Sequence, residues 1–458
     1  MKFDIIQKTP LYSVLSEVGK KIFLPDGIFY WAGRAKKEAE LIGTLGAAYG
    51  FEKDFIDGGS SDWLPCYLKE ISNYSRLSIK EIIPYTSIGG LLETRKIWKE
   101  WIIRKSLYRE EDESLLSRLD KYITTPVITG GVTNGIFQGC VMFLNPNDYI
   151  IMPNKRWGNY DNIINKFIGA KTRTFEFFKN SEMNINALKT AINEVAEIQN
   201  KVVILLNFPN NPTGYVPTKV EASTLVKMLK DSQRNHKKPI IILVDDAYEP
   251  YIYKNNVLNK SIFYDLHRLD EDVIPVKLDG ITKELLIYGG RVGFITLGIK
   301  PSWIENDEEL EKLKTEINNK LEGFIRATIS NCNSFYQVLV HKLFQENSME
   351  HIINSRESVK NLLKNRYECI NSELKKICNP NISIDPNSGG FFVFVNLNPD
   401  KIKATEFADH LLKEYKVGII PIEKSDENIN GIRIAYCSID LNIIPELVKR
   451  INLALNDF

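Results

Sequence analysis

The chain has few of the residues that build disulfide frameworks or metal centres. Its 458 residues include 6 cysteines and 5 histidines. The cysteines lack paired spacing and the histidines lack the spacing of metal ligands, which argues against a disulfide scaffold and against zinc. Scattered thiols fit a reducing compartment better than an oxidising one. We therefore expect a cytoplasmic protein without a bound metal.

Strong charge of one sign and long apolar runs are also missing. The 59 basic and 58 acidic residues give a formal net charge of +1, so no basic footprint for nucleic acid or for a membrane surface is present. No apolar run is long enough to span a bilayer. Residues 1–10 contain an acid and a proline where a secretory signal needs an apolar core. The sequence predicts neither nucleic acid nor membrane as a partner.

Hydrophobic and charged residues, at 43% and 26%, are as frequent as in ordinary globular proteins. A chain of this length accommodates two or three domains. Strand-like runs alternate with helical patterns between residues 125 and 297, which is typical of βαβ units with a mostly parallel sheet flanked by helices. Residues 346–458 mix helical patterns with short strand-like runs, which predicts a second, smaller α+β domain.

Polar residues collect just after three of the apolar strand-like runs. Trp157 follows residues 149–152, Asn211 follows residues 201–206, and Asp245 and Tyr248 follow residues 239–244. Open parallel sheets bind ligands at this edge. A buried aspartate there needs a positive partner, such as a pyridinium nitrogen, while Trp157 suits stacking on a ring and Tyr248 suits a bond to its oxygen. Core packing or helix capping is the alternative for each residue.

Residues 279–293 place a lysine and an arginine beside a pair of glycines. A lysine held among apolar groups near another cation loses its proton more readily, which makes Lys283 a candidate for a Schiff base with an aldehyde. The forked guanidinium of Arg291 suits a phosphate, and Gly289 and Gly290 are expected to form the turn. An aldehyde that carries a phosphate is pyridoxal phosphate. The alternative is a surface lysine and a structural arginine in a β-turn.

Two glycine-rich segments give weaker signals. Residues 125–144 read as a strand, a glycine turn and an apolar helix, and the free N–H groups of such a helix start suit a phosphate at Gly131, Val132 and Thr133. Residues 40–50 contain three glycines, Gly46 among them, which would allow a ligand to approach the backbone. Plain turns are the alternative for both segments.

Taken together and in order, these segments resemble the fold-type I pyridoxal-phosphate enzymes, specifically the class I/II aminotransferases of the aspartate and aromatic type. The resemblance runs from about residue 40 to the end. It implies a Schiff base at Lys283, Asp245 on the pyridine nitrogen, and a tyrosine, Tyr85, that reaches the cofactor phosphate of the neighbouring subunit. The cofactor-binding residues that it implies are Tyr85, Gly131, Val132, Thr133, Trp157, Asn211, Asp245, Tyr248, Thr282, Lys283 and Arg291.

The resemblance also implies a substrate site. Arg433 matches the arginine that clamps the substrate's α-carboxylate, and Gly46, Trp157 and Asn211 are expected beside it. Arg326 falls where the aspartate enzymes bind the distal carboxylate of a dicarboxylic substrate, although a structural arginine on a helix explains it equally well. One position departs from the family, which often has serine three residues before the lysine.

That position is Gly280 here, so either Thr282 contributes the missing phosphate bond or the phosphate site is looser. The expected catalytic residues are Lys283, Asp245 and Tyr248. The expected domains are residues 1–83, an arm with the first part of the small domain; residues 84–330, the large cofactor-binding domain; and residues 331–458, the C-terminal small domain.

The activity implied is transamination between an L-amino acid and a 2-oxo acid, with glutamate and 2-oxoglutarate as one pair, in a homodimer with shared active sites. Two alternatives stay open from the residues. The same scaffold also supports pyridoxal-phosphate lyases and β- or γ-replacement enzymes. A regulatory protein that keeps the fold without turnover is the third reading, and the retention of Lys283 argues against it.

Overall fold

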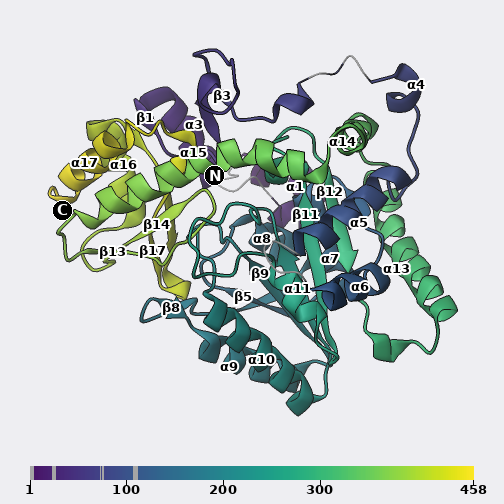
Figure 1. Ribbon diagram of the computed structural model, residues 1–458. Helices are drawn as coiled ribbons and strands as arrows, with labels where there is room; N and C mark the ends of the chain where they lie inside the picture. The colour runs from purple at the N-terminus through teal and green to yellow at the C-terminus, as the bar shows by residue number, and fades with distance from the viewer. Residues whose placement is uncertain (1–4, 23–26, 73, 75–76, 107–111) are drawn as a thin grey trace.

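A seven-stranded sheet forms the centre of the protein in a computed structural model that describes residues 5–22, 27–72, 74, 77–106 and 112–458 (Figure 1). Its strand order is β4-β12-β11-β10-β9-β5-β6. β12 runs antiparallel to its neighbours β11 and β4, and the other paired strands run parallel. This confirms the predicted α/β fold with a mostly parallel sheet. The strands are β4 (Val127–Thr129), β5 (Tyr149–Pro153), β6 (Lys171–Phe175), β9 (Val202–Asn207), β10 (Ile240–Asp245), β11 (Val273–Gly280) and β12 (Gly293–Leu297).

Helices cover this sheet because its central strands are apolar on both faces. Every residue of β9 and β10 is buried, as parallel strands between two helical layers require. α7 packs against β10, β11 and β12, and α9 packs against β5, β6 and β9 (Figure 1). The helices around the sheet are α4 (Ile79–Ile82), α5 (Leu92–Ser106), α6 (Glu113–Tyr122), α7 (Val132–Phe143), α8 (Asn159–Asp161), α9 (Ile185–Ile198), α10 (Lys219–His236), α11 (Ile262–His267), α12 (Ile281–Glu284), α13 (Asp307–Thr328) and α14 (Ser334–Glu346).

The start of α10 illustrates how local sequence fixes an element. The Thr218 side chain accepts a hydrogen bond from the Glu221 N–H at 3.1 Å, and the Glu221 carboxylate accepts one from the Thr218 N–H at 2.7 Å. The sequence Thr218-Lys-Val-Glu221 by itself predicts this capping box, which satisfies two N–H groups at the helix start. The helix ends at His236, before Lys237 in the left-handed conformation (φ 53°).

A second, four-stranded antiparallel sheet lies in the C-terminal part of the chain, with the order β13-β14-β17-β16. The N-terminal part joins it, because β1 (Leu41–Ile42) pairs with β15 (Val417–Gly418) and α3 (Ile28–Glu38) packs on β15. Figure 1 shows these purple segments beside the yellow C-terminal helices. The predicted small domain built from both ends of the chain is confirmed. Its other elements are β13 (Ile382–Ile384), β14 (Val393–Leu397), β16 (Ile420–Lys424), β17 (Ile429–Ile434), α16 (Ala404–Tyr415) and α17 (Ile444–Leu455).

The long helix α15 (Met349–Lys375) runs from the region beside the large sheet to the small domain (Figure 1). It packs against α17 in the small domain, whereas α14 before it packs against α5 beside the large sheet. The domain boundaries predicted after residues 83 and 330 remain predictions. In the part of the chain that the structure describes, no helix combines the length and apolar character needed to cross a membrane. The remaining short elements are α1 (Pro10–Ser13), α2 (Glu17–Lys21), β2 (Tyr49–Phe51), β3 (Trp63–Pro65), β7 (Phe178–Lys179) and β8 (Glu182–Met183).

A cluster of buried charges lies between β10, β11 and α5. Lys277 of β11 is fully buried, and its ammonium bonds the carboxylates of Asp246 and, at 2.8 Å, Glu249. Lys105 of α5 bonds Glu249 at 2.8 Å and Glu284 at 3.2 Å. Nearby carboxylates raise the pKa of Lys277 far above its usual range despite its burial. Charged groups are stable in the protein interior only when oppositely charged partners neutralise them.

We predict that Lys277→Met lowers the free energy of unfolding by about 3–5 kcal/mol, because two buried carboxylates lose their shared cation. Urea unfolding monitored by circular dichroism measures the change. Lys227→Met is the control, since Lys227 forms a surface pair with Asp231 and its side chain is 79% exposed. That pair is expected to contribute less than about 0.5 kcal/mol. Equal stabilities of the two variants would contradict the prediction.

Candidate functional site

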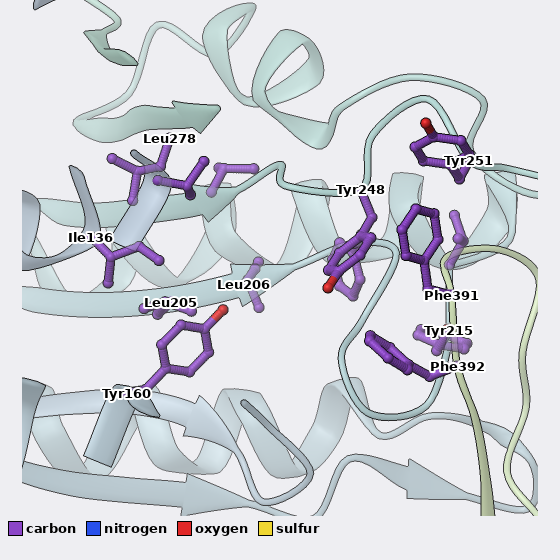
Figure 2. Close-up of a cluster of buried hydrophobic side chains, with 14 of the residues drawn as sticks. Ile136, Tyr160, Leu205, Leu206, Tyr215, Tyr248, Tyr251, Leu278, Phe391 and Phe392 are labelled. Carbon is purple, nitrogen blue, oxygen red and sulfur yellow. The ribbon is translucent and has the colours of Figure 1, made fainter. Parts of the chain in front are cut away.

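A cavity of about 320 Å³ opens where β9, β10 and β11 end, between the large sheet and the small domain. It therefore lies at the edge where parallel sheets bind ligands. Figure 2 shows Tyr160 and Tyr248 on opposite sides of this region, with their hydroxyl groups directed toward the space between them. The lining residues are Ile28, Phe29, Ala32, Thr44, Leu45, Gly46, Val132, Thr133, Ile136, Trp157, Tyr160, Asn207, Asn211, Asp245, Ala247, Tyr248, Lys283, Phe392 and Arg433.

Asp245, the last residue of β10, presents a buried carboxylate to the cavity. Burial raises its pKa, and hydrogen bonds from the Tyr160 hydroxyl (2.5 Å) and the Ala247 N–H (3.1 Å) oppose that rise by stabilising the charged form. Asn207, at the end of β9, donates to the Asp245 carbonyl at 2.8 Å and accepts from the Asn211 N–H at 2.8 Å. These contacts hold the carboxylate and the Asn211 segment at fixed positions on the strand edge.

Lys283 lies in the short helix α12, three residues after β11 ends. Burial lowers the pKa of its amine to about 8; the Asp245 charge opposes that shift, and the positive charge of Arg291 adds to it. The amine lies 5.2 Å from the centre of the Tyr248 ring, and the Tyr251 hydroxyl bonds the Lys283 carbonyl at 2.9 Å. The cavity thus contains an amine that loses its proton more readily than an ordinary lysine does.

Hydrogen bonds of Glu284, the residue after Lys283, hold the lysine turn in place. Glu284 is buried and accepts hydrogen bonds from Trp101 Nε1 at 3.2 Å and Arg356 Nη1 at 2.6 Å, in addition to Lys105. Arg356 belongs to α15, the helix that reaches the small domain. Glu284 therefore ties the lysine turn to the buried charges and to the connecting helix.

Three glycines pack backbone against backbone beside the lysine turn. A side chain at Gly280 would meet the Gly293 Cα at 2.8 Å, and one at Gly293 would meet the Gly131 carbonyl carbon at 2.5 Å. Gly131 itself has φ 86°, which favours glycine. The serine expected from the family at position 280 has no room here. Thr282 is buried beside Lys283 and does not line the cavity, and its contribution to the phosphate site stays a prediction.

The predicted turn at Gly289 and Gly290 is present, and the Gly290 N–H donates to the Ile287 carbonyl at 3.2 Å. Positive φ angles occur at Leu286 (59°) and Arg291 (52°), on either side of the glycines. Gly290 is needed for space, because an added Cβ would meet the Ile287 side chain at 2.7 Å. The backbone strain therefore falls on the arginine itself, which turns its guanidinium toward the neighbouring helix start.

A site that suits an anion, which we call the anion seat, forms where α7 begins. Gly131 precedes the helix, and the first N–H groups of a helix, here those of Val132 and Thr133, have no acceptor within it. The Arg291 guanidinium packs against this turn, since a Cβ on Gly131 would lie 2.4 Å from its Nη2. Free N–H groups, the positive helix end and a guanidinium together suit a phosphate.

Arg433 of β17 brings a buried cation to the opposite wall. It is 3% exposed, and burial lowers its pKa to about 10. Its guanidinium donates to Asn211 Oδ1 at 3.2 Å and to the Thr44 carbonyl at 3.0 Å, and lies 4.3 Å from the centre of the Phe392 ring. Its Nε is buried and has no hydrogen-bond partner among the described residues. An arginine with unused donors at a cavity wall suits a small carboxylate ligand.

Most of the residues predicted for the site meet in this cavity, but two lie elsewhere. Tyr85 is 92% exposed and does not line the cavity of its own chain. Arg326 lies on α13, where it bonds Ser330 Oγ at 2.5 Å, also outside the lining. The predicted residues that line the cavity are Gly46, Val132, Thr133, Trp157, Asn211, Asp245, Tyr248, Lys283 and Arg433, with Gly131, Thr282 and Arg291 adjoining.

Sequence reasoning missed Tyr160, Asn207 and Tyr251. Asn207 had a usable signal, since it ends a buried strand as Asp245 does. Tyr160 follows Trp157 by three residues and belongs to the same segment. Tyr251 had no local signal, because its bond to the Lys283 carbonyl joins residues that are 32 positions apart.

Comparison with known proteins agrees with this geometry. The family model of class I and II aminotransferases matches residues 107–451, so the chain belongs to that family. The aspartate aminotransferase of Pyrococcus horikoshii is 25% identical over 375 residues, which cover 81% of this chain and 83% of that protein.

Two solved structures share the fold. An aminotransferase from Anaerococcus prevotii superposes with a TM-score of 0.79 at 23% identity, covering 97% of this chain and 99% of that chain. The α-aminoadipate aminotransferase LysN from Thermus thermophilus, complexed with N-(5'-phosphopyridoxyl)-L-leucine, gives a TM-score of 0.70 at 18% identity, covering 97% and 98%. The chain is therefore an aminotransferase with the fold-type I architecture.

We predict that the Lys283 amine in cofactor-free protein titrates near pH 8. Only the neutral amine reacts with acylating reagents, so a lowered pKa moves its reactivity to lower pH. Trace acetylation between pH 6 and 11, with peptide mass spectrometry, follows the rate. N-acetyl-lysine amide in the same mixture reports the ordinary pKa of about 10.4. In Asp245→Asn the pKa falls further, because a charge that favours the protonated amine is lost. Half-maximal labelling of Lys283 near pH 10 would contradict the prediction.

Proposed function

We propose that this protein is a pyridoxal-phosphate-dependent aminotransferase that moves an amino group between an L-amino acid and a 2-oxo acid. The observation that carries the proposal is the convergence of Lys283, Asp245 and Arg433 on one cavity. The three supply an amine of lowered pKa, a buried carboxylate and a buried guanidinium with an unused donor. Each suits a different part of one complex of cofactor and amino acid.

The residues present fit pyridoxal phosphate. Lys283 would hold the cofactor covalently, and the seat at the start of α7 with Arg291 would hold its phosphate. Asp245, which is buried and hydrogen-bonded by a tyrosine hydroxyl and a backbone N–H, would pair with the pyridine nitrogen. The remaining proposed contacts are Trp157 on the ring face, Asn211 and Tyr248 on the ring oxygen, Gly131, Val132, Thr133 and Thr282 around the phosphate, and Tyr85 from a second subunit.

When bound, the cofactor supplies an electron sink for the electrons left at the substrate's α-carbon. Asp245 sustains this property while it stays ionised, which the hydrogen bonds from Tyr160 and Ala247 favour. Arg433 binds the substrate's α-carboxylate through its planar fork and so fixes the direction of the Cα–H bond. Gly46 and Asn211 flank that position.

Lys283 then serves as the general base and acid. Its amine is uncharged in a large fraction of molecules near pH 8, so it can take the proton from the substrate's α-carbon. It can then return that proton to another atom of the complex of cofactor and amino acid. The bonds of Tyr251 to its carbonyl and of Arg356 to Glu284 keep the turn in place during this transfer. A fixed base close to its proton is the geometry that proton transfer needs.

The finer features of the proposal follow from the family resemblance. Glutamate and 2-oxoglutarate are proposed as one substrate pair, with Arg326 of a second copy as the residue for the distal carboxylate. A homodimer with shared sites is proposed because Tyr85 is exposed and does not line the cavity of its own chain. A cytoplasmic location is proposed from the cysteines, all six of which are free thiols. The domain limits after residues 83 and 330 are proposed likewise.

A half-reaction screen tests the function. Holoprotein mixed with single L-amino acids is expected to lose the absorption band that this cofactor gives at about 420 nm when it is bound to lysine. Addition of 2-oxoglutarate is expected to restore the band. Lys283→Ala is expected to show neither change. Release of equal ammonia and 2-oxo acid without an added acceptor would contradict transamination and favour a lyase.

We predict that Arg433→Lys lowers kcat/KM for amino donors by about 10- to 100-fold, because one charge-assisted hydrogen bond to the carboxylate, about 1.5–3 kcal/mol, is lost. Steady-state kinetics with a coupled assay measure the ratio. Arg366→Lys is the matched control, since Arg366 is fully buried but bonds only the backbone carbonyls of Tyr49 and Cys437 among the described residues. An equal loss in both variants would mean that Arg433 acts through folding rather than through the substrate.

A further inference from the structure

One wall of the cavity is apolar and has no part in the function proposed above. Helix α3 contributes Ile28, Phe29 and Ala32, which share one face of the helix. Its other face carries Trp31 and Ala35, which are buried, and Ala35 packs against Gly418 of β15. The helix is therefore held by one face and turns the other face toward the cavity.

The large apolar side chains on this wall are exposed to the cavity rather than packed in the core. Phe29 is 63% exposed and Leu45 is 44% exposed, and both line the cavity. Such side chains gain stability when an apolar ligand covers them. Aromatic and aliphatic walls with a few polar groups are typical of a site that reads an apolar substituent.

No charged residue of the described cavity lining remains to neutralise a second carboxylate on the substrate. Within the described lining they are Asp245, Lys283 and Arg433, and the proposed function assigns all three. A carboxylate placed against Phe29 and Leu45 would lose its hydration without gaining a partner. The wall of one chain therefore discriminates against acidic side chains, and the glutamate and 2-oxoglutarate proposed above depend on Arg326 of a second copy.

The position of Arg433 directs the substrate side chain toward this wall. Its guanidinium bonds the Thr44 carbonyl, next to Leu45, and stacks on Phe392. A substrate whose α-carboxylate is held there and whose amine reaches Lys283 has only its α-hydrogen and its side chain left. The lining that the proposed function leaves unassigned includes Leu45, Phe392 and the face of α3.

We propose that the preferred amino donor is a neutral L-amino acid with a bulky apolar side chain, recognised by Ile28, Phe29 and Leu45. The proposal rests on the aminotransferase function proposed above and names its substrate class. It predicts that Leu45 and the α3 face, rather than a cation, set the specificity of the first half-reaction.

Leucine, asparagine and aspartate give a matched test, because their side chains have the same branched shape and differ in polarity and charge. We expect kcat/KM of the holoenzyme for leucine to exceed that for alanine by about 30- to 100-fold, from the area of three buried carbon groups. Asparagine and aspartate are expected to fall at or below alanine. Rapid mixing of holoenzyme with each amino acid, followed at the cofactor band, measures these ratios without a second substrate.

Substitutions on α3 test the assignment to this wall. Phe29→Ala is expected to narrow the leucine-to-alanine ratio about tenfold, and Phe29→Arg is expected to raise kcat/KM for aspartate relative to leucine. Tyr30→Ala is the matched control, because Tyr30 is the neighbouring exposed aromatic residue, at 52%, and does not line the cavity. It is expected to leave the ratio unchanged within twofold.

The outcomes separate this proposal from the function on which it rests. A spectral change with aspartate that is faster than with leucine, and that Arg326→Gln abolishes, would overturn the apolar donor while supporting the aminotransferase. An unchanged leucine-to-alanine ratio in Phe29→Ala would also overturn it. A cofactor band that no amino acid alters would overturn the proposed function, and the donor class with it.

Discussion

The close packing of three backbone segments is the constraint on which the site depends. Gly131, Gly280 and Gly293 touch without side chains between them, so the start of α7, the end of β11 and the start of β12 lie at van der Waals distance. This brings the anion seat beside the lysine turn. The same packing explains why position 280 cannot carry the serine that is common in the family, and it turns Arg291 toward Gly131.

Beneath this surface, buried charges hold the strand ends together. Asp246 and Glu249 follow β10, Lys277 lies within β11, and Glu284 follows the catalytic lysine candidate. Ion pairs in low dielectric are costly to separate, so the set fixes the distance between the segments that carry Asp245 and Lys283. Arg356 extends the set to α15, which links the lysine turn to the small domain that supplies Arg433.

The sequence allowed much of this arrangement to be predicted, because parallel strands end at one edge. The predicted positions of Asp245, Asn211 and Trp157 after apolar runs place them in one cavity, as observed. The capping box of α10 is likewise a local pattern with a local cause. Neither prediction required knowledge of distant contacts.

The rest could not be predicted because it depends on pairs far apart in the chain. The bond of Tyr251 to Lys283, the loss of space at Gly280 and the strain at Arg291 arise only when β11 and β12 pack on the α7 turn. The apolar wall of the cavity comes from α3, more than 200 residues before Lys283. The role of α3 as a cavity wall follows from its position in the fold and not from a sequence pattern.

The proposed mechanism depends on the attachment of the cofactor to the ε-amine of Lys283. Reduction of the holoprotein with borohydride, followed by peptide mass spectrometry, tests this attachment directly. A stable phosphopyridoxyl adduct on Lys283 is the expected result. An adduct on another buried lysine, such as Lys105, Lys277 or Lys300, or no adduct in protein that has bound the cofactor, would contradict it.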